Sequence, residues 1–272
     1  MIPTAQITHW RQHAPWVQDV QVEQDLIISR AIVELFEHPE ISRSLAFRGG
    51  TALHKLHIEP ARYSEDIDLV QVEQEPIGET IDALREVLSP WLGEAVNWEQ
   101  KHARFILRYQ VDSESQSAPP IRLKVEINTR EHFTVNGLKT RKFAVDSPWF
   151  NGEAEVTTYG LEELLATKLR ALYQRKKGRD LFDLSYVLEQ ADPSVPEVVE
   201  ICREYLRRGE NTISRAEFEQ NLEDKRSDTG FRTDVEPLLA NHIDWDFKDA
   251  LETVMDEYIS EFPGDSWEGE PS

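Results

Sequence analysis

The sequence predicts an α/β (α+β) fold, a mixed sheet with flanking helices followed by a helical C-terminal domain. Between residues 45 and 158, short apolar segments with strand-like alternation are interspersed with amphipathic helical segments, as in a sheet covered by helices. After Gly160 the strand signals stop and only helical patterns remain. We therefore expect an α/β domain over residues 1–158, a helical domain over 159–262 and a disordered acidic tail over 263–272.

The expected elements of the first domain follow from apolar spacing and from turn residues. Pro39 cannot continue the helix before it, Thr51 is suitably placed to cap a short helix, and Asn136-Gly137 is typical of a hairpin turn. Lys55 is expected to be an exposed helix residue. The predicted helices are 14–37, 52–57 and 77–92, and the predicted strands are 45–47, 66–72, 103–111, 121–128, 133–135, 139–145 and 153–158.

The second half reads as a series of amphipathic helices separated by glycine and proline. Gly178 is expected to end the first of them in a left-handed cap. The predicted helices are 161–176, 180–190, 196–208, 214–224 and 246–260.

Composition limits the class of protein. The chain has 272 residues, a single cysteine and no apolar run approaching the ~20 residues of a membrane span, which favours a cytoplasmic protein without disulfides or a cysteine metal site. Its net charge of −21 is unevenly distributed, with ten acids against Lys248 over residues 244–272. Residues 168–179 instead hold six cations and no acid. Such a basic segment indicates an anion site, or a helix end whose dipole favours cations.

Residues 48–69 carry the central motif of the chain. In the strand that begins at Asp66, alternation places Asp66 and Asp68 on one face and directs Ile67 and Leu69 to the core. Two neighbouring carboxylates repel unless a cation lies between them, and Mg²⁺ is commonly bound by such carboxylates together with substrate phosphates. Gly49-Gly50 permits close approach of a bulky anion to the backbone, and the helix that follows offers free N–H groups. The order of these features predicts nucleotide chemistry.

Three further side chains extend this motif. A two-metal phosphoryl-transfer site usually contains a third carboxylate, and Glu126 lies on the polar face of its predicted strand. The alternative is a surface glutamate paired with Lys124 or Arg122. Arg62 and Ser64 precede the aspartates, where they could bind phosphate oxygens or brace the loop.

A second motif spans residues 162–184. Lys168 and Arg175 are seven residues apart on a predicted helix, roughly 10 Å along its axis, so one could reach a triphosphate while the other meets a second anion. Asp180 and Asp183 begin the next helix, where acids also suit the helix dipole.

The string GGTALHKL…RYSEDIDL resembles the opening motif of AbiEii/AbiGii-type nucleotidyltransferase toxins, MenT-like members of the polymerase-β-like superfamily. The 162–184 segment is similar to their second signature. The resemblance covers roughly residues 45–190. It implies a nucleotidyltransferase-like sheet and metal-dependent transfer of a nucleoside monophosphate from an NTP, with Mg²⁺ or Mn²⁺. It further implies a cognate antitoxin as partner and the 3′ end of tRNA as a plausible acceptor.

The resemblance also implies roles for named residues. Asp66, Asp68 and Glu126 would bind metal and act in catalysis, with Lys168 and Asp180 as further catalytic residues. Lys168 would bind the nucleotide phosphates, and Asp180 or Asp183 would orient Lys168, Arg175 or the substrate. The remaining nucleotide-binding candidates are Gly49, Gly50, Thr51, Arg62 and Ser64.

Two other functions are compatible with these residues. The enzyme could nucleotidylate a protein instead of an RNA, which leaves the chemistry of the site unchanged. Alternatively, the chain could be a regulatory module that binds nucleotide without turnover. The acidic residues at positions 66, 68 and 126 argue against the second alternative.

Overall fold

The structure is a computed structural model that describes residues 2–101, 103–115 and 118–269. The chain divides into two compact units, Met1–Tyr159 and Gly160–Ser272, and each is described by itself. No helix in the described part of the chain is long and apolar enough to cross a membrane.

The first unit is built on a seven-stranded mixed sheet in the order β3-β4-β5-β2-β1-β7-β6. Strand β2 runs parallel to β5 and β1 runs parallel to β7, whereas the other neighbouring pairs are antiparallel. The strands are β1 (Leu45–Arg48), β2 (Asp66–Gln71), β3 (Asn97–Lys101), β4 (Arg104–Val111), β5 (Ile121–Asn128), β6 (Lys139–Asp146) and β7 (Asn151–Thr158).

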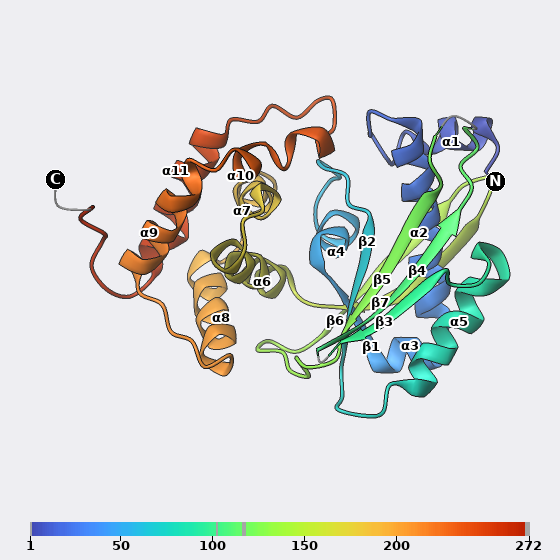
Figure 1. The fold of residues 1–272 in the computed structure, drawn as a ribbon, viewed down its shortest axis with the longest axis horizontal. Coiled ribbons are helices and arrows are strands. Elements are labelled where there is room, and N and C mark those ends of the chain that lie inside the picture. Colours follow the sequence, from blue (N-terminus) through green and yellow to red (C-terminus); the bar gives the residue numbers. More distant parts are fainter. Residues whose placement is uncertain (1, 102, 116–117, 270–272) are drawn as a thin grey trace. The chain divides into compact units, whose positions relative to one another are not determined.

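Helices cover one face of this sheet, and a short helix lies on the other (Figure 1). Figure 1 shows α2, α3 and α5 together on one side, with α4 opposite them. The long helix α2 is buried around most of its surface between the sheet and its neighbours, and its buried residues include Glu23, Gln24 and Asp25. The helices are α1 (Thr4–Trp10), α2 (Asp19–Glu37), α3 (Pro39–Ser44), α4 (Gly49–Leu56) and α5 (Gly78–Leu92).

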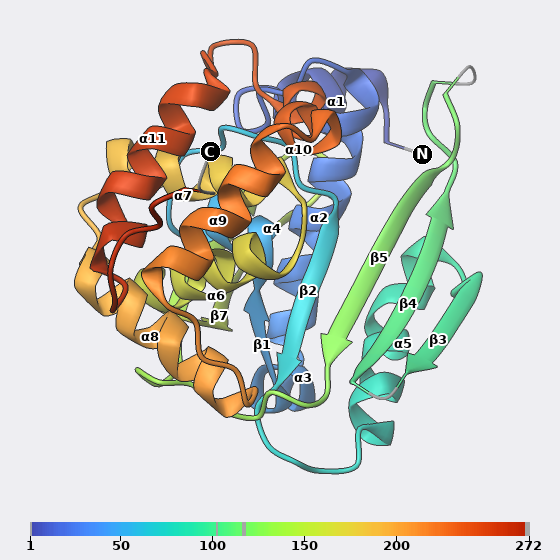
Figure 2. The ribbon, with the colours of Figure 1, turned by 60° about the vertical axis from the view of Figure 1, so that its left-hand side comes forward.

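Apolar and polar residues alternate along the central strands, so one face of the sheet is buried. In β5, Leu123, Val125 and Ile127 are buried, whereas the alternate residues are half-buried or exposed. Ile67 and Leu69 of β2 are buried in the same way. Figure 2 shows β2, β5, β4 and β3 side by side in this order. The charged residues of these strands therefore share one face of the sheet.

The predicted sheet and helical elements of this unit are largely confirmed, with five differences. The first long helix begins at Asp19 because residues 14–18 form a loop, and Pro39 opens the unpredicted helix α3. Helix α1 and strand β3 were also unpredicted. The predicted strand over residues 133–135 is wrong, because β6 pairs with β7 and not with a preceding hairpin partner.

The second unit is helical. Its core is formed by aromatic and aliphatic side chains that include Tyr205, Phe218 and Tyr258. Residues 263–267 run along α9, with Arg215 N donating to Pro263 O and Trp267 N donating to Glu219. Residues 270–272 of the expected tail lie outside the described residues. The helices are α6 (Leu161–Gln174), α7 (Gly178–Gln190), α8 (Val195–Arg208), α9 (Arg215–Arg226), α10 (Thr229–Thr233), α11 (Phe247–Glu257), and the 3₁₀ turns η1 (Glu236–Leu238) and η2 (Ile259–Glu261).

Gly178 does not end a helix in the left-handed region, so this prediction is wrong. It is the first residue of α7, and α6 ends instead at Arg175 in an extended conformation. A Cβ at Gly178 would collide with the carbonyl oxygen of Phe231. The glycine is required by the close approach of α10 and not by its backbone angle.

Candidate active site

Strand register brings the three predicted carboxylates onto one sheet face. Asp68 lies opposite Glu126 of β5 on one side and opposite Arg48 of β1 on the other. Asp66 lies opposite Lys124 of β5. Because directly opposite residues in neighbouring strands point to the same face, all five side chains project from the polar face of the sheet.

Gly49 permits the start of α4 to lie directly against Asp68. Its φ is +82°, in the region that favours glycine. A Cβ at this position would collide with Oδ2 of Asp68 and lie only 3.0 Å from its Cβ. The anion that approaches this glycine within the chain is thus the carboxylate of Asp68 itself.

Asp68 lies in an environment that disfavours its charge. Burial raises its pKa, and the neighbouring carboxylates of Asp66 and Glu126 act in the same direction, whereas Arg48 and Lys124 oppose them. Among the described residues, no hydrogen bond or ion pair engages the carboxylate of Asp68. A site of this kind gains from an added cation.

Asp66 and Asp68 are suited to bind a metal ion, whereas Glu126 is not. Asp66 and Asp68 supply hard oxygen donors from one strand face. Glu126, however, is engaged through both oxygens: Oε1 accepts from Arg104 at 3.1 Å, and Oε2 lies 3.3 Å from Nζ of Lys124. Within the described residues, no group of three histidines, cysteines or acids is arranged to hold a metal ion.

Thr51 and Ser64 connect α4 to the start of β2. Thr51 is buried and lies inside α4, so the prediction that it caps the helix is wrong. Its hydroxyl donates to the carbonyl oxygen of Asp66 at 2.5 Å and lies 2.9 Å from Oγ of Ser64. Both side chains therefore fix the loop that leads into β2, the strand that carries the aspartates.

Arg62 is buried in the same loop. Its guanidinium donates to the carbonyl oxygen of Tyr63 at 3.2 Å, and only 2% of the residue is exposed. Of the two roles predicted for Arg62, bracing of the loop agrees with this burial better than contact with a soluble phosphate does.

In the second unit, Lys168, Arg175 and the two acids of α7 form one charged cluster. Lys168 Nζ lies 2.7 Å from Oδ2 of Asp183 and 3.5 Å from Oδ1 of Asp180. Arg175 contacts both oxygens of Asp180 at 2.7 and 2.8 Å. The side chains of Asp180 and Asp183 are fully buried, whereas half of the Arg175 side chain is exposed. The two acids therefore fix the position of Lys168.

The basic segment 168–179 is largely neutralised within its own unit. Besides the pairs of Lys168 and Arg175, Lys176 lies 3.6 Å from Asp228. Lys177 and Arg179 lie 3.3 and 3.9 Å from Asp234. The acids that follow it in the chain supply the compensating charge, so the segment is a weaker anion site than its composition suggests.

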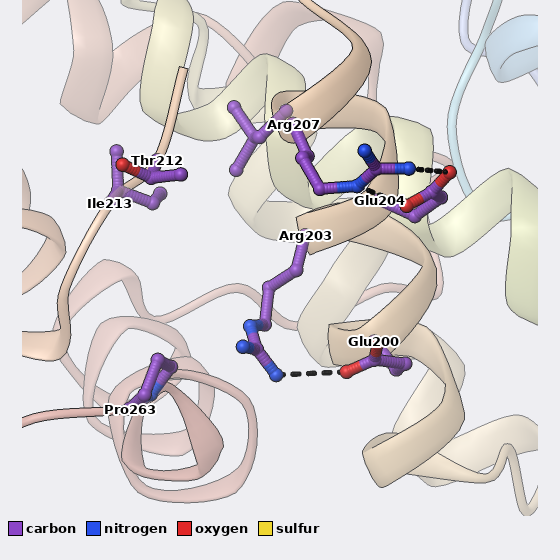
Figure 3. A pocket seen from close by; sticks show the side chains of 8 residues that line it. Glu200, Arg203, Glu204, Arg207, Thr212, Ile213 and Pro263 are labelled. Carbon is purple, nitrogen blue, oxygen red and sulfur yellow. Dashed lines mark hydrogen bonds and ion pairs between the residues drawn. The ribbon is translucent and has the colours of Figure 1, made fainter. Parts of the chain in front are cut away.

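A cavity of about 190 Å³ also lies in the second unit, but it does not involve these residues (Figure 3). Its arginines are already paired, Arg203 with Glu200 at 2.8 Å and Arg207 with Glu204 at 2.8 Å. No residue predicted to carry chemistry lines it. The lining residues are Glu200, Arg203, Glu204, Leu206, Arg207, Thr212, Ile213 and Pro263.

Comparison with known proteins identifies the family. The model of the nucleotidyl transferase AbiEii toxin family, from type IV toxin–antitoxin systems, matches residues 30–253. The chain belongs to the AbiEii family. It is accordingly a nucleotidyltransferase toxin of a type IV toxin–antitoxin system, as its sequence motifs indicate.

Two solved structures share the fold of the AbiEii chain. One is MenT4, a nucleotidyltransferase toxin from Mycobacterium tuberculosis H37Rv, with a TM-score of 0.67 and 14% sequence identity. The alignment covers 97% of this chain and 91% of the MenT4 chain. A candidate nucleotidyltransferase from H. pylori has a TM-score of 0.55 at 18% identity, with 89% of this chain and 96% of its own covered. A comparison with curated protein sequences found no match.

The AbiEii motif is also braced by a buried ion pair that sequence reasoning missed. Asp25 of α2 accepts hydrogen bonds from the indoles of Trp10 and Trp16 at 2.8 and 3.0 Å and from Lys55 of α4 at 2.6 Å. Lys55 is thus largely buried, and the expectation that it is exposed is wrong. The available signal was an aspartate directly before the apolar run Leu26–Ile28.

Proposed function

We propose that this AbiEii toxin transfers a nucleoside monophosphate from an NTP to the 3′ end of tRNA. The observation that carries the proposal is the pairing of Asp68 with Glu126 in register, beside Asp66 and the Gly49 turn. The RNA acceptor comes from the family resemblance. The family also implies an antitoxin partner, and we propose that the toxin acts in the cytoplasm, where NTPs and tRNA are present.

We propose that Asp66 and Asp68 hold a divalent cation, Mg²⁺ or Mn²⁺. Such a cation, when bound, neutralises phosphate charge that increases in the transition state. Gly49 and Gly50 offer backbone N–H groups at the start of α4, where an anion is stabilised by the free donors and the helix dipole. Thr51, Ser64 and Arg62 hold this loop in place.

In the proposed reaction, the acceptor hydroxyl oxygen forms a bond to the α-phosphorus of the NTP. The bond from that phosphorus to the bridging oxygen of the β-phosphate breaks, and pyrophosphate leaves with the bonding electron pair. The hydroxyl proton passes to the carboxylate cluster, to which Glu126 contributes. Positioning and electrostatic stabilisation supply the rate enhancement.

For the second unit we propose that Lys168 binds the nucleotide phosphates. Asp183 and Asp180 keep its ammonium in position, and Arg175 holds Asp180. An exposed lysine loses side-chain entropy on binding an anion, whereas Lys168 is already ordered by its two acids. The two buried acids therefore preorganise Lys168 for contact with phosphate.

The test is incubation with each α-³²P-labelled NTP, total tRNA and Mg²⁺, followed by separation of RNA from protein. We expect label in the tRNA fraction for the unaltered chain. Asp68→Asn should abolish the label, while Asp112→Asn, at an exposed acid after β4, should not change it. Label in protein would identify a protein acceptor, and nucleotide binding without pyrophosphate release would identify a regulatory module. Equal labelling by the Asp68 variant would refute the proposed site.

A further inference from the structure

We infer that the ammonium of Lys124 takes the position of a second metal ion between Asp66 and Glu126, so that the toxin works with a single divalent cation at Asp66 and Asp68. This inference rests on the proposed function, and it identifies Lys124 as a positioning residue for that reaction. It departs from the two-metal, three-carboxylate site that the sequence suggests.

The first argument is contact geometry. Nζ of Lys124 lies 2.7 Å from Oδ2 of Asp66 and 3.3 Å from Oε2 of Glu126, and therefore bridges two of the three predicted metal ligands. A second metal ion shared by these acids would have to occupy the same space. An ammonium at this position supplies one positive charge and satisfies the two carboxylate oxygens by hydrogen bonding and charge.

The second argument is that Lys124 cannot easily leave. It lies in β5, whose backbone is paired on both sides, with β2 and with β4. Its ammonium donates to Oδ2 of Asp66 at 2.7 Å, and 30% of the side chain is exposed. The side chain is therefore held at its tip by a predicted metal ligand and at its base by a strand that is paired on both edges.

The third argument concerns the other oxygen of Glu126. Arg104, opposite the end of β5, contacts Oε1 at 3.1 Å while Lys124 contacts Oε2. Both oxygens of Glu126 thus face a cation supplied by the protein. By contrast, Asp68 has no such contact among the described residues, and the pair Asp66 and Asp68 remains open to one added ion.

The experiment counts bound Mn²⁺ by electron paramagnetic resonance, with Mn²⁺ alone as the probe. We expect one bound ion per chain for the unaltered protein and a second one for Lys124→Met, because loss of the ammonium frees Asp66 and Glu126. Lys124→Arg should keep the count at one. Lys142→Met removes an exposed ion pair with Glu153, between β6 and β7, and should also leave the count at one.

Each outcome bears on the inference. Two ions of similar affinity on the unaltered chain, none at all, or one ion on Lys124→Met would overturn it. Should Lys124→Met not fold, as judged by circular dichroism, Lys124→Gln serves as the second variant. The number of bound Mn²⁺ ions can be measured without nucleotidyl transfer. If the unaltered chain binds one ion and Lys124→Met binds two, but no tRNA is labelled, the proposed function is refuted and the single-ion site is retained.

Discussion

The guanidinium of Arg175 contacts both carboxylate oxygens of Asp180, at 2.7 and 2.8 Å, while the same carboxylate lies 3.5 Å from Lys168. Arg175 follows the last turn of α6, and Asp180 lies in the first turn of α7. One buried acid thereby ties two consecutive helices to the lysine that we propose as a phosphate ligand. Removal of Asp180 should destabilise the protein more than removal of Arg175, because Asp180 is buried and half of the Arg175 side chain is exposed.

Asp180→Asn should lower the free energy of unfolding by about 3 kcal/mol, because it leaves the buried ammonium of Lys168 with one acid. Arg175→Gln should cost roughly 1 kcal/mol, since half of that side chain is exposed and water replaces its contacts. Urea denaturation monitored by circular dichroism measures both. Equal losses would show that Asp180 does not join the two cations.

Gly49→Ala offers a test of the contact with Asp68 that has a matched control. Gly93 has nearly the same φ, +80° against +82°, but nothing lies within 4 Å of a Cβ there. Gly93→Ala should therefore cost only the backbone strain, roughly 2 kcal/mol at φ +80° and ψ 179°. Gly49→Ala adds the collision with Asp68 and should cost roughly 2 kcal/mol more. Thermal unfolding of both variants, monitored by circular dichroism, gives the difference. A difference near zero would mean that the turn can move away from Asp68.

The strands of the central sheet could be predicted because their alternation is local. Ile67 and Leu69 are fully buried, whereas Asp66 and Asp68 are only partly buried, as period-two alternation requires. The position of Glu126 on the face of the aspartates followed from the same rule. Strand β3 could not be predicted because it lies at the sheet edge with four of its five residues exposed, so its sequence shows no alternation of polar and apolar residues.

The partners of charged residues could not be predicted, because they depend on pairing between distant strands. Lys124 was visible only as a possible partner of Glu126, and its closer contact with Asp66 required the parallel register of β2 and β5. Gly178 had the local signature of a helix cap, and only α10, more than fifty residues later, explains it. Compensation of the basic segment by Asp228 and Asp234 is similarly non-local.

Cys202, the only cysteine, reports on whether the second unit is folded. It is fully buried in α8, and burial raises the pKa of its thiol to about 12. Because only the thiolate attacks a disulfide reagent, we expect no reaction with Ellman's reagent at pH 8 in the native state. One thiol per chain should react in 6 M guanidinium chloride. Rapid reaction of the native chain would indicate that α8 is open to solvent.

Lys225 was not identified from the sequence, and it stabilises the C-terminal end of α6. From α9 its ammonium donates to the carbonyl oxygens of Leu172 and Tyr173, the latter at 2.8 Å, and to Asn221 at 2.6 Å. The last carbonyls of a helix have no partner inside the helix, so Lys225 satisfies groups that would otherwise be buried without one. Lys225→Met should therefore lower the free energy of unfolding by roughly 2 kcal/mol.

The pH dependence of the same variant gives a signed prediction. Burial lowers the pKa of Lys225 to about 8, with Lys176 acting in the same direction and Asp180 opposing them. Between pH 8 and the ordinary value of 10.5, the unfolded chain binds the proton that the folded chain has lost. The contribution of Lys225 to stability must then increase as the pH rises through this window. Urea denaturation should give a larger gap between the unaltered chain and Lys225→Met at pH 9.5 than at pH 7.5. Lys248→Met, at a lysine that is 67% exposed, should show no gap at either pH, and a gap for Lys225→Met that narrows on raising the pH would contradict the lowered pKa.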